Sequence, residues 1–253
     1  MDHWASLKLA SLLSLALLTS APSALAEQQA EPMPQHQQEL NARNASFDEA
    51  VTLMREGRLD DALARLDALI ALHQADPREA SKRYYCASNQ VETLFYLLKA
   101  TKDRQDTVVL PPTWADSLFL RGYILIEQQR HAEARAALQQ AVELSPSNSQ
   151  YLGELAQLLA RTGEAERALE LFAQAKAAAE FSAPEQKAFH LARALRGQGY
   201  ALIELQRYDE AEAAYRTVLA SQPNNRLAQD QLRYIAMQRV AKLRDSAVPK
   251  PRP

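Results

Sequence analysis

Glycine and cysteine are scarce in this sequence of 253 residues, which has six glycines and one cysteine. Cys86 cannot form an internal disulfide, so no disulfide framework stabilises the fold. We expect its thiol to be a small buried apolar group, and the alternative is a bridge to another chain. No stretch shows the alternation of Val, Ile and Thr that is typical of half-buried strands. Ala, Leu, Glu, Gln and Arg, which favour helices, dominate, and the sequence therefore predicts an all-α protein.

Neither sign of charge is in excess, because 29 Lys and Arg face 31 Asp and Glu. Nucleic-acid binders usually carry a clear basic excess, so no nucleic-acid partner is expected. None of the five histidines lies three or four residues from another histidine or a cysteine, as metal ligands often do. Phosphate-binding, dinucleotide-binding, serine-hydrolase and zinc-protease motifs are also missing. The sequence predicts a protein that is not an enzyme and has no cofactor or metal.

The first 26 residues have the features of a signal peptide. Lys8 precedes an apolar run of about ten residues, which is short of the ~20 that span a bilayer. Ala24-Leu25-Ala26 then offers a small-x-small cleavage site. We therefore expect export, to the periplasm or the medium, with no membrane insertion after cleavage; the alternative is an uncleaved amphipathic helix. Residues 27–42, rich in Gln, Glu and Pro, are predicted to be a flexible linker.

One pattern recurs along the rest of the chain. Four similar segments are centred on the alanines Ala62, Ala134, Ala168 and Ala211. A large side chain follows each alanine four residues later, at Leu66, Leu138, Phe172 and Tyr215. A small residue precedes each by twelve, at Ala50, Gly122, Ala156 and Gly199, and a leucine follows it three residues on. Two antiparallel helices approach closely only where their facing side chains are small, so the pattern predicts stacked helical hairpins.

The spacing of 34 residues between Ala134 and Ala168 is that of tetratricopeptide repeats, and the sequence resembles that family over about residues 43–225. The resemblance implies a right-handed α-α superhelix, or solenoid, over residues 43–243, with a disordered tail at 244–253. Its expected units are repeats at 43–76, 77–114, 115–148, 149–182 and 183–225, followed by a capping helix at 227–243.

Two spacings depart from the family period. Ala62 and Ala134 are 72 residues apart, so a degenerate repeat is expected at 77–114, with short helices at 78–87 and 90–103. The alternative is one continuous helix. Ala168 and Ala211 are 43 residues apart, and the nine extra residues are expected to extend the first helix of the last repeat over 183–205.

The resemblance also implies a concave groove lined by the first helix of each repeat. The expected groove residues are Phe47, Arg55, Phe119, Tyr123, Gln157, Arg161, Arg193, Arg196 and Tyr200. The alternative at each position is packing against the neighbouring helix. The sequence therefore predicts an exported, non-catalytic scaffold that binds a protein or peptide, with the oligomeric state open. The alternative function is that of an accessory subunit of a cell-envelope enzyme or assembly complex, stable mainly within that complex.

Overall fold

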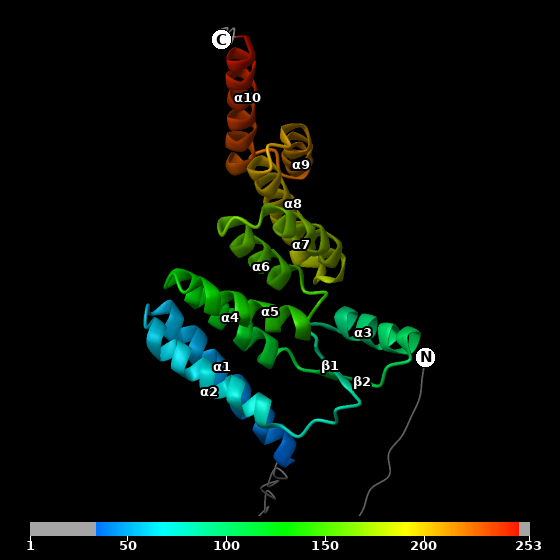
Figure 1. Cartoon of the computed structure of the whole chain (residues 1–253). Coiled ribbons are helices and arrows are strands. Elements are labelled where there is room, and N and C mark those ends of the chain that lie inside the picture. Colours follow the sequence, from blue (N-terminus) through cyan, green and yellow to red (C-terminus); the bar gives the residue numbers. More distant parts are fainter. Residues whose placement is uncertain (1–33, 248–253) are drawn as a thin grey trace, which may run out of the picture.

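The structure is a computed structural model that describes residues 34–247, and helices make up most of this part of the chain (Figure 1). The helices are α1 Gln35–Arg55, α2 Leu59–Ala75, α3 Gln90–Asp103, α4 Thr113–Glu127, α5 His131–Leu144, α6 Ser149–Arg161, α7 Ala165–Ala178, α8 Pro184–Glu204, α9 Tyr208–Ser221 and α10 Arg226–Ala247. A single 3-10 turn follows α7, and two short strands flank α3. The predicted all-α solenoid is confirmed.

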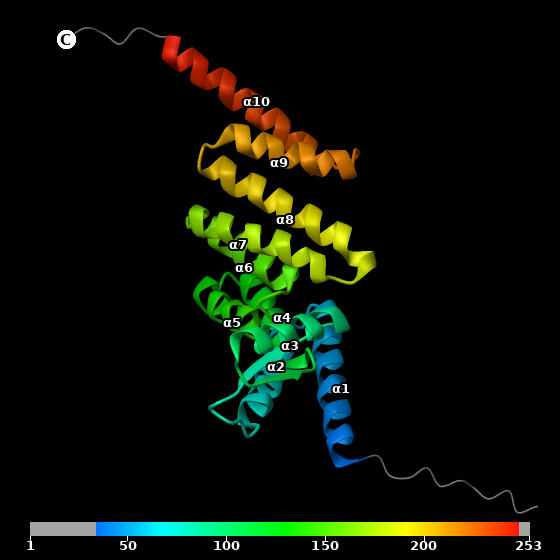
Figure 2. The same cartoon turned by 90° about the vertical axis from the view of Figure 1, so that its right-hand side faces the viewer.

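Four antiparallel hairpins stack in chain order, α1 with α2, α4 with α5, α6 with α7 and α8 with α9. Figure 2 shows this stack from the side, with α10 lying across α9 at one end. No helix among residues 34–247 is both long enough and apolar enough to cross a membrane. The predicted signal peptide and the end of the predicted tail lie outside the described residues, whereas residues 244–247 form the last turn of α10.

The small residues of the repeated pattern lie where two helices of a hairpin touch. A Cβ atom added to Gly122 would lie 2.7 Å from Cγ of Leu138, and one added to Gly199 would lie 2.6 Å from the ring of Tyr215. These distances are shorter than any relaxed carbon–carbon contact. The small residues and the large residues of the repeated pattern are therefore the two sides of one helix–helix contact.

The turn inside each hairpin has the same backbone geometry in all four cases. The residue five positions before each pattern alanine has a positive φ, at Gly57, Gln129, Gly163 and Gln206. The next residue donates its N–H to the carbonyl of a leucine five residues back, as Arg58 does to Leu53 at 2.9 Å and Arg130 to Leu125 at 2.9 Å. This is a Schellman helix end. Any residue could supply the carbonyl, and the leucine recurs because its side chain is buried at all four positions, Leu53, Leu125, Leu159 and Leu202.

Residues 77–114 do not form a degenerate helical repeat. Residues 78–87 contain no helix, so both predictions for them, a separate short helix and part of one continuous helix, were wrong. Strand β1, Arg83–Cys86, pairs in parallel with β2, Thr107–Leu110, and α3 is the crossover between them. Strand β1 buries Tyr85 and Cys86, and parallel strands need such a crossover connection. Because this unit leaves the helical stack, α2 packs directly against α4.

The start of α3 is closed by a reciprocal capping arrangement. The side chain of Asn89 accepts a hydrogen bond from the backbone N–H of Glu92 at 2.9 Å, and the Glu92 carboxylate accepts one from the N–H of Ser88 at 2.8 Å. These reciprocal bonds satisfy two of the free N–H groups at a helix start. Glu92 is only 3 % exposed.

The linker prediction was wrong for residues 35–42, because α1 begins at Gln35. A contact between the two helices of the first hairpin holds this extension. The guanidinium of Arg43 donates to both carboxylate oxygens of Asp76, each at 2.6 Å. The first turns of α1 are thereby tied to the end of α2, 33 residues later in the chain.

Candidate functional site

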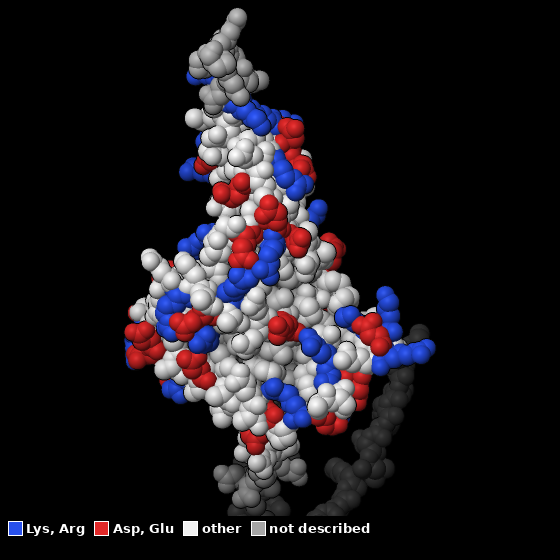
Figure 3. Space-filling model, viewed as in Figure 1, with Lys and Arg blue, Asp and Glu red and all other residues white. Residues whose placement is uncertain are grey.

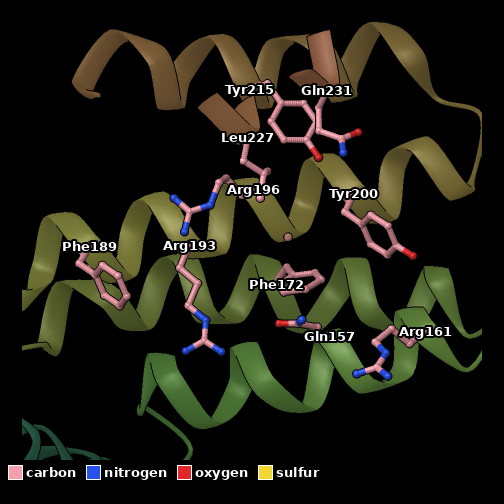
Figure 4. A pocket seen from close by; sticks show the side chains of 11 residues that line it. Gln157, Arg161, Phe172, Phe189, Arg193, Arg196, Tyr200, Tyr215, Leu227 and Gln231 are labelled. Atoms are coloured by element: carbon pink, nitrogen blue, oxygen red, sulfur yellow. The ribbon is translucent and has the colours of Figure 1, made fainter. Parts of the chain in front are cut away.

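A cavity of about 630 Å³ opens on the solenoid where α6, α8 and α10 lie in succession (Figure 4). These are the first helices of two hairpins and the helix that follows the last hairpin. The lining residues are Gln157, Arg161, Phe172, Phe189, Arg193, Arg196, Gly197, Tyr200, Tyr215, Leu227 and Gln231. We call this cavity the α8 groove.

Helix α8 supplies the largest share of the groove. Phe189, Arg193, Arg196 and Tyr200 are spaced by four, three and four residues, so they lie along one face of the helix. Figure 4 shows them in succession along α8. Phe189 is 57 % exposed and Tyr200 is 37 % exposed, which leaves both rings available to a ligand.

The floor of the groove exists because α8 has a glycine there. A Cβ atom on Gly197 would lie 2.1 Å from the ring of Phe172. The Phe172 ring, from α7, therefore packs directly against the α8 backbone and is nearly buried. On the other side Tyr215, from α9, packs against Gly199 in the same way. The two glycines thus set both aromatic rings at the bottom of the groove.

The charges of the groove have one sign. Acidic and basic side chains are interspersed over the face seen in Figure 3, but the groove lining contains three arginines and no acid. Arg193 is paired with Glu154, a residue outside the lining. Burial and the nearby Arg193 lower the pKa of Arg196, so its charged form is poorly solvated in this structure.

Five of the nine predicted groove residues meet in this cavity, namely Gln157, Arg161, Arg193, Arg196 and Tyr200. The other four lie elsewhere. Phe119 stacks on Tyr151 with ring centroids 5.0 Å apart, and Phe47 is half-buried against the core. Tyr123 and Arg55 are exposed outside the α8 groove.

Sequence reasoning missed the rest of the lining. The helical spacing of Phe189 to Arg193 was a usable signal for Phe189. Phe172 and Tyr215 are two of the large side chains of the repeated pattern. That pattern predicted that they pack between helices, but not that they also contact a groove. Leu227 and Gln231 belong to α10 and had been assigned to a capping helix. Both residues line the groove only because of the way α10 crosses the end of the stack.

The lining contains no Ser, Thr, Cys, His, Lys, Asp or Glu side chain, and its titratable groups are two tyrosines and three arginines. Across residues 34–247 no three His, Cys, Asp or Glu side chains lie together as a metal site would require. The groove instead offers aromatic rings, amides and guanidinium groups. This set is suited to holding a ligand by packing, hydrogen bonds and charge.

The geometry defines a class of protein, the solenoids built from stacked helical hairpins. The tetratricopeptide repeat family matches this chain twice, over residues 119–183 and over residues 192–225. The chain therefore contains tetratricopeptide repeats, and the α8 groove falls within and beside these two matches.

Solved structures with the same fold are similar over most of the chain. PilW, described as a widely conserved type IV pilus biogenesis factor, is 16 % identical with a TM-score of 0.55, over 78 % of this chain and 70 % of that chain. A MamA double mutant from RS-1 is 14 % identical with a TM-score of 0.55, over 78 % of this chain and 84 % of that chain. No curated protein sequence matches the chain. At these identities the likeness shows the fold.

Proposed function

We propose that this protein is an exported, non-catalytic scaffold that binds a segment of another protein in the α8 groove. The observation that carries the proposal is the convergence of residues from α6, α8 and α10 on one cavity of about 630 Å³. Tetratricopeptide repeats commonly serve as protein-interaction modules, and aromatic and arginine side chains are the usual anchors of such contacts.

The exported location is proposed from the sequence. The apolar run and the Ala24-Leu25-Ala26 site precede the described residues, and removal of residues 1–26 leaves a chain that begins at Glu27. The helices of residues 34–247 form a self-contained stack, so cleavage at this point removes none of the elements that build the groove.

Site-specific photo-crosslinking tests the binding face. A benzoylphenylalanine at position 189, where the native Phe189 is 57 % exposed, places the probe at the groove. A matched control at position 72, where Leu72 is 55 % exposed on α2, places it outside the groove. A partner that uses the groove should cross-link at position 189 and not at position 72.

The partner recovered in this way then allows a quantitative test. Tyr200→Ala should weaken its binding, by about thirtyfold if Tyr200 is a hot spot. Tyr123→Ala is the matched control, because Tyr123 is similarly exposed, at 39 %, but lies outside the cavity. Cross-links only at position 72, or equal losses for both variants, would show that the partner uses another surface.

A second candidate, an accessory subunit that is stable mainly in a complex, is favoured by the outer face of α3. Val91, Leu94, Leu97 and Leu98 are between 46 % and 61 % exposed on this one helix. Contiguous apolar surface of this kind is typical of contact sites. If it is a subunit contact, the purified chain should self-associate, and Leu94→Gln with Leu98→Gln should abolish the association without lowering the melting temperature. A monodisperse wild-type chain would contradict this candidate.

A further inference from the structure

We infer that the α8 groove selects an acidic protein segment, one in which an Asp or Glu side chain is flanked by a large apolar side chain. The inference rests on the proposed function and specifies its ligand. The arginines of α6 and α8 would receive the carboxylate, and the exposed apolar residues at the edges of the groove would receive its neighbour.

The first argument is the pairing of the arginines. Arg193 has its partner in Glu154. Within residues 34–247, Arg161 and Arg196 form no hydrogen bond and no ion pair. The lining holds no carboxylate that a rotation of either side chain would reach. A guanidinium presents five N–H donors in a fork that matches a carboxylate, so two such groups are left for a ligand.

The second argument is the solvation of Arg196. Its side chain is half-buried beside the second arginine of the same helix face, and the pKa of Arg196 is lowered by that burial and by repulsion from Arg193. A partly desolvated charge without a partner is unfavourable. A carboxylate bound there replaces the lost hydration and offsets the repulsion, whereas a neutral or basic side chain does neither.

The third argument is the hydroxyl of Tyr215. The residue has a relative exposure of 1 %, it lines the groove, and its hydroxyl makes no hydrogen bond to another residue within the described part of the chain. Figure 4 shows the ring extending from α9 toward α8, with its oxygen on the groove side. The donor opens onto the groove, so an acceptor oxygen of a bound ligand would accept from it.

The fourth argument concerns the apolar flank. Phe189, on α8, and Leu227, on α10, are 57 % and 52 % exposed, and both line the groove. A carboxylate ligand without apolar groups, such as a small metabolite, would leave both uncovered. A protein segment with a large apolar residue next to its acid covers them and also satisfies the arginines.

A random dodecapeptide library displayed on phage tests the inference without knowledge of the natural partner. Panning against the mature chain should enrich clones that carry Asp or Glu next to Leu, Ile, Phe, Tyr or Trp. Panning in parallel against Phe189→Ala/Tyr200→Ala should not enrich the same clones. One enriched peptide is then synthesised with a fluorescein label, together with a version in which each Asp or Glu is replaced by Asn or Gln.

Fluorescence anisotropy then measures affinity. Arg196→Gln should weaken binding of the acidic peptide by about ten- to a hundredfold, the loss expected for one charge-assisted hydrogen bond, and Arg161→Gln should act in the same direction. The neutral peptide should bind weakly to wild type and to Arg196→Gln alike. Arg55→Gln is the matched control, because Arg55 is exposed and lies outside the groove. Melting curves of all variants confirm that each is folded.

The outcomes separate the inference from the proposed function. Enriched peptides without acids, or acidic peptides that bind Arg196→Gln as well as wild type, overturn the inference and leave peptide binding in the groove intact. Clones that bind the Phe189→Ala/Tyr200→Ala variant equally, or no enrichment at all, overturn both. Displacement of the labelled peptide by a twelve-residue thymidine oligonucleotide, with no difference between the acidic and neutral peptides, would assign the arginines to nucleic acid instead.

Discussion

The contact between Gly122 on α4 and Leu138 on α5 gives a sharp test of hairpin packing. In an exposed helix, replacing glycine by alanine stabilises a protein by about 1 kcal/mol, because alanine restricts the unfolded chain and favours the helix. At Gly122 the new Cβ atom would lie 2.7 Å from Cγ and 2.9 Å from Cδ2 of Leu138, and 3.3 Å from the carbonyl oxygen of Ala134.

Leu138 cannot move away easily, because it is fully buried between the hairpins. The two helices must therefore separate slightly, and overpacking of this kind costs about 1–3 kcal/mol. The net effect of Gly122→Ala should be a loss of up to about 2 kcal/mol once the gain in helix propensity is subtracted. Gly153 on α6 is the matched control, since a Cβ atom there would meet nothing within 4 Å. Gly153→Ala should stabilise the protein by about 1 kcal/mol.

Urea unfolding followed by far-ultraviolet circular dichroism measures both effects on the same scale. The two variants should shift the midpoint in opposite directions, and their melting temperatures should differ by several degrees, at about 2–4 °C per kcal/mol for a chain of this size. A Gly122→Ala variant as stable as Gly153→Ala would refute the claim that this glycine sets the distance between α4 and α5.

Three further predictions rest on the structure and one rests on the sequence. Ala134→Leu, at a fully buried position between helices, should lower stability by roughly 1–3 kcal/mol in thermal unfolding; an unchanged melting temperature would mean that the repeat register is wrong. Gln129→Gly should raise stability by about 1 kcal/mol, because Gln129 has φ of 60° in a turn where the equivalent residue of two other hairpins is glycine, and a loss would contradict the account of the turn. Burial raises the pKa of Glu92 from 4.5 to about 7, so wild type should lose stability relative to Glu92→Gln as pH rises through that window, and parallel pH profiles for the two proteins would show that the carboxyl is not desolvated. Sequencing of the exported protein should find Glu27 at its N-terminus, and an intact N-terminal methionine would remove the export proposal.

The sequence by itself determined the helical hairpins. Close packing of two antiparallel helices imposes a small residue opposite a large one at fixed separation, and that constraint is visible in a single chain at Gly122 and Leu138. The helix ends are equally local, since a leucine carbonyl and a residue with positive φ lie within six positions of each other. These features were predictable because their causes act over a few turns of helix.

Only the tertiary structure decided the segment between the first and second hairpins. The four residues of β1 and the four of β2 carry too little alternation to indicate strands, and each is stabilised by the other across a crossover of about twenty residues. In the same way, Arg43 orders the start of α1 by its contact with Asp76, 33 residues later in the chain. No local sequence pattern predicts this contact.

The candidate site was also predictable from the sequence only in part. Repeat positions placed Arg193, Arg196 and Tyr200 on one face of α8, because a helix fixes the direction of side chains three and four residues apart. The depth of the groove, its floor at Phe172 and its far wall at Leu227 depend on the angles at which α7 crosses α8 and α10 crosses α9. Those angles are set by packing between whole helices, which is why the sequence predicted an arginine-bearing face and the tertiary structure turned it into a cavity.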